Sequence, residues 1–160
     1  MKISLRPIKG PWDIGWVLDK HSSSSQFLGY DAYGHPHFDT TRTEVGEATY
    51  RLKYKDDTDQ AKALAQAVAM HIYPMLENVG FIVPMPASRV RVRQPVTAVA
   101  QELGAIVKLH VATDLLLKAP GGKSLKDLTS KDEKIEAILL STPFSNPSFC
   151  APPNARMMMV

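Results

Sequence analysis

One short apolar run, residues 81–83 (Phe-Ile-Val), contains no polar position and is bounded by Gly80 and Pro84. A run of this kind predicts a strand that is buried on both faces, as the strands of parallel sheets are. Pro84 has no N–H to donate to a ladder, so the strand is expected to end there. The hydrophobic pattern therefore places a buried strand near the middle of the chain.

A helix and a second strand are expected directly after this run. Pro95 suits the first position of a helix, and Gly104 suits the position that closes one, so the helix is expected from Pro95 to about Leu103. Its apolar face comprises Val96, Val99, Ala100 and Leu103. A second strand is expected within residues 106–111, and the resulting βαβ unit should have a right-handed crossover.

Two more helices are predicted upstream. Thr43 offers an N-cap for a helix that runs to about Tyr54, and Asp57 with Gln60 has capping-box spacing for the next helix. Each segment carries an apolar stripe at helical spacing: Val45, Ala48 and Leu52 in the first, and Ala61, Leu64, Ala65, Val68, Ile72 and Leu76 in the second.

Both ends of the chain lack this helical pattern. Residues 1–40 combine short apolar and aromatic pieces with Gly and Pro, which is typical of antiparallel strands, and the serines at 22–25 are interpreted as a linker. Residues 142–160 are rich in proline and are expected to be a disordered tail. The prediction is a single α/β domain over residues 1–141, with an N-terminal antiparallel β unit (1–42) and a core of parallel sheet and flanking helices (43–141).

The composition narrows the class of protein. The 160 residues are 44% hydrophobic and 22% charged, which is ordinary for a globular domain. The chain has no apolar stretch of about 18 residues and no leader pattern, so no membrane partner is expected. Cys150 is the only cysteine, which excludes a disulfide framework and favours a cytoplasmic location. A net charge of +3 is far below that of a dedicated nucleic-acid binder.

Three arginines, Arg89, Arg91 and Arg93, follow the predicted buried strand. Ligands of open α/β sheets bind at the carboxyl ends of the strands, and guanidinium groups suit phosphate. The arginines therefore indicate a site for an anionic ligand. A solvated basic loop is the alternative interpretation, and both remain open here.

Several segments resemble the ComF-like phosphoribosyltransferase family. The likeness extends over about residues 12–144 and is carried by residues 16–21, 38–43 and 50–54, by residues 82–86 with the arginines and residues 99–104, and by Lys118, Lys123 and the glycine pair between them. The resemblance implies a type I phosphoribosyltransferase fold. It also implies a phosphoribosyl pyrophosphate ligand with Mg²⁺, with Arg89, Arg91 and Arg93 at the phosphate and Lys118 and Lys123 in the flexible loop, and a link to competence and DNA uptake.

One part of the family pattern is missing. Family members continue with a strand, an acidic pair and a Thr-Gly turn that cradles the ribose 5′-phosphate, and residues 140–160 contain no such motif. The sequence therefore predicts a sheet that is incomplete at its C-terminal side, through an early end or a change of frame. We expect impaired catalysis and self-association through the open sheet edge. The alternative function is a non-catalytic module of the same fold that binds nucleic acid or protein.

Two weaker constellations complete the sequence. His35 and His37 with Asp31 and Asp39 could bind a divalent metal ion at the edge of a hairpin, but no fourth strong ligand is spaced for closure of the site. We therefore interpret them as polar turn residues, and no metal site is predicted. Tyrosines at 50, 54 and 73 with the arginines could stack single-stranded nucleic acid, but helix packing is the commoner use of such tyrosines.

Overall fold

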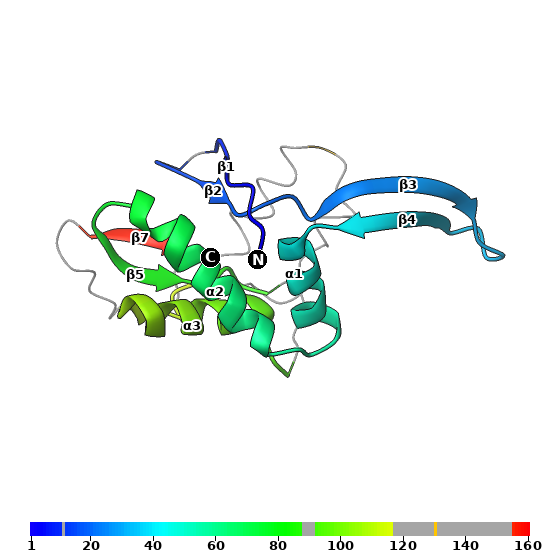
Figure 1. The fold of residues 1–160 in the computed structure, drawn as a ribbon. Helices are drawn as coiled ribbons and strands as arrows, with labels where there is room; N and C mark the ends of the chain where they lie inside the picture. Colours follow the sequence, from blue (N-terminus) through cyan, green and yellow to red (C-terminus); the bar gives the residue numbers. More distant parts are fainter. Residues whose placement is uncertain (11, 88–91, 117–129, 131–154) are drawn as a thin grey trace. The chain divides into compact units, whose positions relative to one another are not determined.

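A computed structural model describes residues 1–10, 12–87, 92–116, 130 and 155–160 of the chain. The described elements, in chain order (Figure 1), are β1 (Arg6–Pro7), β2 (Trp16–Val17), β3 (Ser22–Tyr30), β4 (Pro36–Arg42), α1 (Glu44–Tyr54), α2 (Asp59–His71), the 3₁₀ helix η1 (Tyr73–Met75), β5 (Val79–Val83), α3 (Pro95–Val107), β6 (His110–Val111) and β7 (Arg156–Met159).

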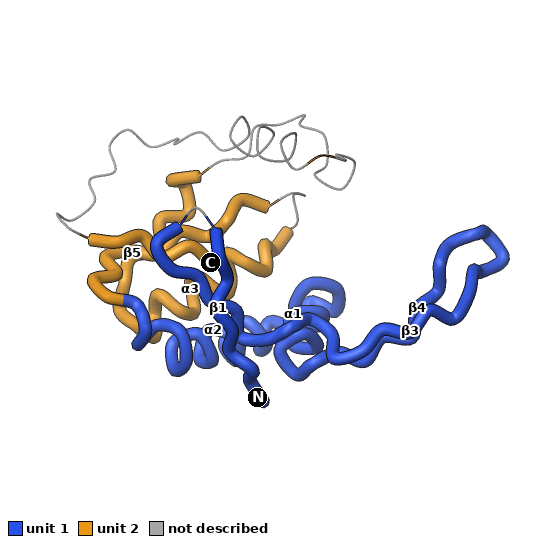
Figure 2. The backbone as a smooth tube through the Cα atoms, turned by 90° about the horizontal axis from the view of Figure 1, so that it is seen from above, with its two compact units in different colours: residues 1–76 blue, residues 77–160 orange. Residues whose placement is uncertain are grey.

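The chain divides into two compact units, Met1–Leu76 and Glu77–Val160 (Figure 2). The first unit holds two antiparallel hairpins, β1–β2 and β3–β4, together with α1 and α2. The second holds a three-stranded sheet in the order β6-β5-β7 together with α3. This division differs from the expected boundary at residue 42, because α1 and α2 group with the N-terminal strands.

The second unit is built around β5, as the apolar run predicts. Phe81 is 6% exposed, and Ile82 and Val83 are fully buried. Strand β6 pairs with β5 in parallel, with Phe81 opposite His110 and Ile82 opposite Val111. The expected parallel strand pair joined by a helix is therefore confirmed, and the chain has the predicted α/β class, with a parallel sheet and separate antiparallel sheets.

The far side of β5 is covered by β7, where a disordered tail was expected. Strand β7 runs parallel to β5, from Val79 opposite Arg156 to Val83 opposite Met159. The Val160 N–H donates to the Val83 carbonyl at 3.1 Å, which extends the ladder by one residue. The expectation is wrong for Arg156–Met159, because the run of methionines there supplies the apolar side chains of a short strand. Residues 142–154 lie outside the described part of the chain.

With β7 in place, β5 is not an edge strand. Its two neighbours, β6 and β7, are the outer strands of the sheet within the described residues. The expectation of self-association through an open sheet edge does not name a strand, and it stays a prediction.

Helix α3 begins as predicted and ends later than predicted. Pro95 is its first residue, and Val99, Ala100 and Leu103 are buried, but Val96 is 40% exposed and does not belong to the buried face. Gly104 lies inside the helix, which closes at Lys108 in the left-handed conformation (φ 57°). The second strand is correspondingly short, only His110–Val111.

The helices of the first unit follow the predicted pattern closely. The Thr43 hydroxyl accepts a hydrogen bond from the Gly46 N–H at 3.0 Å, and α1 buries the predicted Val45, Ala48 and Leu52. Thr58, and not Asp57, occupies the N-cap position of α2, without a capping hydrogen bond from its side chain, so the helix starts one residue later than predicted. None of the helices within the described residues has the length and apolar character needed to cross a membrane.

The predicted antiparallel β unit is confirmed as two separate hairpins. In the longer one, the serines at 22–25 are part of β3 and pair with β4, so the linker interpretation is wrong. Serine has no strong preference for strands, and the pairing with the threonine-rich β4 decides the conformation.

The methionines of β7 provide a test of its pairing. Met158 is 7% exposed and Met159 is 49% exposed. We expect Met158→Ala to lower the free energy of unfolding by about 2 kcal/mol or more, because it opens a cavity beside β5, and Met159→Ala to lower it by less than about 1 kcal/mol. Urea denaturation of the two variants measures this difference, and equal effects would contradict the pairing of β7 with β5.

Candidate ligand-binding site at the ends of the parallel strands

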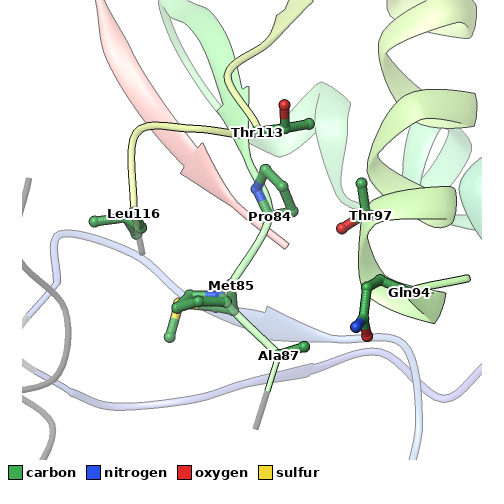
Figure 3. Close-up of a pocket in the computed structure, with 8 residues that line it drawn as sticks. Pro84, Met85, Ala87, Gln94, Thr97, Thr113 and Leu116 are labelled. Atoms are coloured by element: carbon green, nitrogen blue, oxygen red, sulfur yellow. The ribbon is translucent and has the colours of Figure 1, made fainter. Parts of the chain in front are cut away.

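A cavity of about 250 Å³ lies in the second unit, where the parallel strands end (Figure 3). Three segments line it: the residues that follow β5, the start of α3, and the residues that follow β6. The lining residues are Pro84, Met85, Pro86, Ala87, Gln94, Thr97, Thr113 and Leu116. This is the carboxyl edge of the sheet, the place where α/β sheets bind their ligands.

The first wall exists because two prolines end the ladder of β5. Pro84 and Pro86 have no N–H groups, so neither residue can continue the strand through donated hydrogen bonds. Between them, the Met85 N–H donates to the Val160 carbonyl at 2.9 Å. The wall is thereby attached to the residue that follows β7, so its position depends on the C-terminal strand.

The second wall is the first turn of α3. Gln94 is the N-cap in an extended conformation, and its carbonyl accepts a hydrogen bond from the Ala98 N–H at 3.0 Å. The first N–H groups of a helix have no partner within it, and the helix dipole makes this end positive. The first turn of α3 contains no acidic residue that would offset this charge. The wall therefore favours an anion over a cation.

The third wall follows β6 and is anchored in the core. The Ala112 N–H donates to the Ile82 carbonyl at 2.9 Å, which joins this segment to β5. Ala112 and Leu115 are buried with Phe81 and Val83, and Leu116 packs against this cluster. Thr113 is exposed and lines the cavity between these anchored positions.

The predicted phosphate-binding residues lie next to this cavity in the sequence. Arg93 is exposed and directly precedes Gln94. Arg89 and Arg91 lie outside the described residues, but Ala87 and Gln94, which flank the arginine segment, both line the cavity. The segment that contains the three arginines therefore begins and ends at the cavity. Lys118 and Lys123 of the expected flexible loop also lie outside the described residues.

Thr97, Thr113 and Leu116 carry no sequence motif that marks them as site residues. The only signal for Thr113 and Leu116 is that they follow the second parallel strand, whose end shares an edge with the end of the first. The signal for Thr97 is its place in the first turn after Pro95.

No protein-family model, curated protein or solved structure matches the chain. The likeness to ComF-like proteins consequently rests on the sequence segments alone, and the function has to be argued from the cavity itself.

The metal constellation near residue 35 has a structural use. One Asp31 carboxylate oxygen accepts the N–H groups of Tyr33 and His35, both at 2.8 Å, and orders the turn between β3 and β4. The hydrogen bond from the His35 backbone is the main cause that lowers the pKa of Asp31 below its ordinary value. Among the described residues, no group of three or more His, Cys, Asp or Glu side chains is placed to hold a metal ion.

Two of the tyrosines considered for stacking, Tyr50 and Tyr54, contact other side chains of the first unit. The Arg42 guanidinium lies 3.8 Å from the centre of the Tyr50 ring, and the Tyr50 and Tyr54 rings are 5.2 Å apart. Arg42 therefore occupies one face of Tyr50 that a base would need.

Gly104 sets how closely α3 approaches the strand that carries the third wall. A Cβ atom at Gly104 would overlap the Val111 Cγ2 atom and lie 2.9 Å from the Leu109 carbonyl oxygen. We expect Gly104→Ala to be destabilising by about 1–3 kcal/mol through overpacking, in spite of a gain of about 1 kcal/mol in helix propensity. Thermal or urea unfolding measures the change.

The variant Val111→Ala supplies the control for this prediction. It removes the Cγ2 atom, so Gly104→Ala should cost less in that background than in the native chain. A native chain that gains stability from Gly104→Ala would contradict the close approach.

Proposed function

We propose that this chain binds phosphoribosyl pyrophosphate, or a related phosphorylated ribose compound, at the cavity beside β5, β6 and α3. The observation that supports the proposal is the place of the cavity: it lies at the carboxyl ends of two parallel strands, and the segment with Arg89, Arg91 and Arg93 begins and ends at it. The sequence resemblance supplies the class of ligand and the type I phosphoribosyltransferase fold.

The pyrophosphate end of the ligand fits the chemistry of the walls. Guanidinium groups form charge-assisted, bidentate hydrogen bonds with phosphate oxygens. The N–H groups at the start of α3 are further donors, and the helix dipole makes this end favourable for an anion. Two threonines, Thr97 and Thr113, also line the cavity. Arg93, which precedes Gln94 at the cavity, is the described arginine closest in sequence to these donors.

Mg²⁺ has no site of its own among the residues that line the cavity. None of the eight lining residues carries a carboxylate, the side chain that binds Mg²⁺ in most protein sites. In the proposal, Mg²⁺ belongs to the ligand and is coordinated by its phosphate oxygens. Its effect is to lower the negative charge that the protein has to accommodate.

The proposed activity is binding of the ligand without transfer of its phosphoribosyl group. Residues 140–160 contain neither the family's acidic pair nor its Thr-Gly turn, and no described lining residue supplies a carboxylate in their place. The ribose end of the ligand is thus left without the groups that hold it in the family. The proposal includes a cytoplasmic location and, through the family resemblance, a link to DNA uptake.

Removal of the arginine charge should abolish pyrophosphate binding. For Arg93→Ala we expect at least about a tenfold rise in the dissociation constant, because one charge-assisted hydrogen bond to phosphate is lost, and for Arg89→Ala with Arg91→Ala we expect no measurable binding. Isothermal titration calorimetry with pyrophosphate and with phosphoribosyl pyrophosphate, with and without Mg²⁺, measures the affinities. Higher salt should weaken the binding.

Arg156→Ala is the matched control. Arg156 is exposed and begins β7, so it lies at the opposite edge of the same parallel sheet, and its loss should leave the affinity unchanged. Equal affinities of the native chain and the double variant would overturn the site. Release of pyrophosphate in the presence of a purine or pyrimidine base would overturn the claim that the chain does not catalyse transfer.

A further inference from the structure

The β3–β4 hairpin carries three aromatic rings on one face. Phe27 lies directly opposite Phe38 in the register, and the two ring centres are 5.4 Å apart. Tyr30 contacts the edge of Phe27 at a centre distance of 5.3 Å. These three rings, called the aromatic face here, are 50%, 50% and 72% exposed for Phe27, Phe38 and Tyr30. A contiguous exposed aromatic cluster of this kind is typical of an interaction surface.

Among the described residues, the hairpin is stabilised mainly by contacts between its own two strands. Its two strands form a two-stranded sheet, and every residue of both is exposed or half-buried. Figures 1 and 2 show the hairpin extending away from α1 and α2 of the same unit. An isolated two-stranded hairpin is only marginally stable in water, and a third strand or a packed face is needed to stabilise it.

The two edges of the hairpin differ in their protection against pairing. Strand β4 begins with Pro36 and carries Asp39 and Arg42, and proline and charge are the usual means by which an edge strand avoids a partner. Strand β3 has nine residues, none charged and none proline. Its irregular positions lie at Ser22/Ser24 and Phe27/Gly29, which leaves residues 24–27 as a regular stretch. The outer edge of β3 is therefore the one suited to accept another strand.

We propose that β3 pairs with β3 of a second copy of this chain, in antiparallel orientation about a two-fold axis near Gln26. Antiparallel pairing about a two-fold is self-complementary, so one edge serves both copies. Gln26 of one copy then lies opposite Gln26 of the other, and Ser25 lies opposite Phe27. The two aromatic faces come to the same side of a four-stranded sheet, where the rings extend one another's apolar surface.

The charge of the hairpin favours a second copy over nucleic acid. An uncharged β3 meets its copy without like-charge repulsion across the axis. A phosphate backbone, in contrast, needs a positively charged surface, and the hairpin's Asp31 and Asp39 outnumber its one arginine, Arg42. The Arg42 guanidinium is in addition engaged by Glu47 at 3.5 Å and by the Tyr50 ring.

A pair of lysine variants tests the proposal on the full chain. Gln26→Lys sets two positive charges opposite each other at the axis, so the dissociation constant of the dimer should rise by about tenfold. Thr41→Lys is the matched control, because Thr41 lies on the same face of the hairpin but on β4, and it should leave the dimer unchanged. Sedimentation equilibrium over a range of concentrations measures both. A native chain that stays monomeric, or two variants with equal effects, would overturn the proposal.

Disulfide trapping gives a second measurement that does not depend on affinity. In a chain whose single cysteine is removed by Cys150→Ser, Gln26→Cys should form a disulfide-linked dimer under mild oxidation, since directly opposed strand residues have Cβ atoms within reach of a disulfide. Thr41→Cys should form it much more slowly. Binding of a labelled oligothymidylate by a monomer, lost in Phe27→Ala, would instead assign the aromatic face to nucleic acid and overturn the proposal.

Discussion

The pairing of β5 on both sides is the constraint on which the second unit depends. Ile82 and Val83 are fully buried, and a strand buried in this way has to place all its backbone groups in hydrogen bonds. Strand β6 satisfies one side and β7 the other. Because β7 comes from the C-terminal part of the chain, β5, the most buried of the described strands, is completed only when residues separated by nearly half of the sequence meet.

The candidate site also depends on the pairing of β5 with β6 and β7. The cavity's first wall leaves β5 at Pro84 and is attached through Met85 to Val160, while its third wall is joined to β5 through Ala112. The ladder that buries β5 thus positions the first and third walls. The second wall is the start of α3, the helix that connects the two strands. In this arrangement the two walls are held in place by backbone hydrogen bonds, which do not depend on any side-chain polar group.

The sequence predicts the parts of this fold that depend on local signals. The buried run at 81–83, Pro95 at the start of α3 and Thr43 at the start of α1 each act through neighbouring residues, and the structure has all three. The failures involve distant partners. Gly104 has the residue type of a helix cap, but its missing Cβ is needed for contact with Val111, which only the folded chain brings near. Strand β7 is not predictable from the sequence, because its four residues follow a proline-rich segment and form a strand only through pairing with β5. The cavity is predicted in position, by the strand ends, but Thr97 and Thr113 are known to line it only once α3 and β6 are placed.

The serines of β3 and the methionines of β7 show the same rule at two edges. Neither segment has the alternation of apolar and polar residues that is typical of a strand. Each forms a strand because it pairs with a neighbouring strand: the serines with β4 and the methionines with β5. Strand β5, with which the methionines pair, and strand β3, which contains the serines, differ at their second edge. Strand β5 has neighbours on both sides, so its groups are satisfied within the unit. Strand β3 has β4 as its one neighbour within the described part of the chain, and its other edge carries neither charge nor proline to prevent pairing. An edge of this kind is a template for pairing, and because strand pairing about a two-fold needs no second kind of surface, a copy of the same chain is the simplest partner for it.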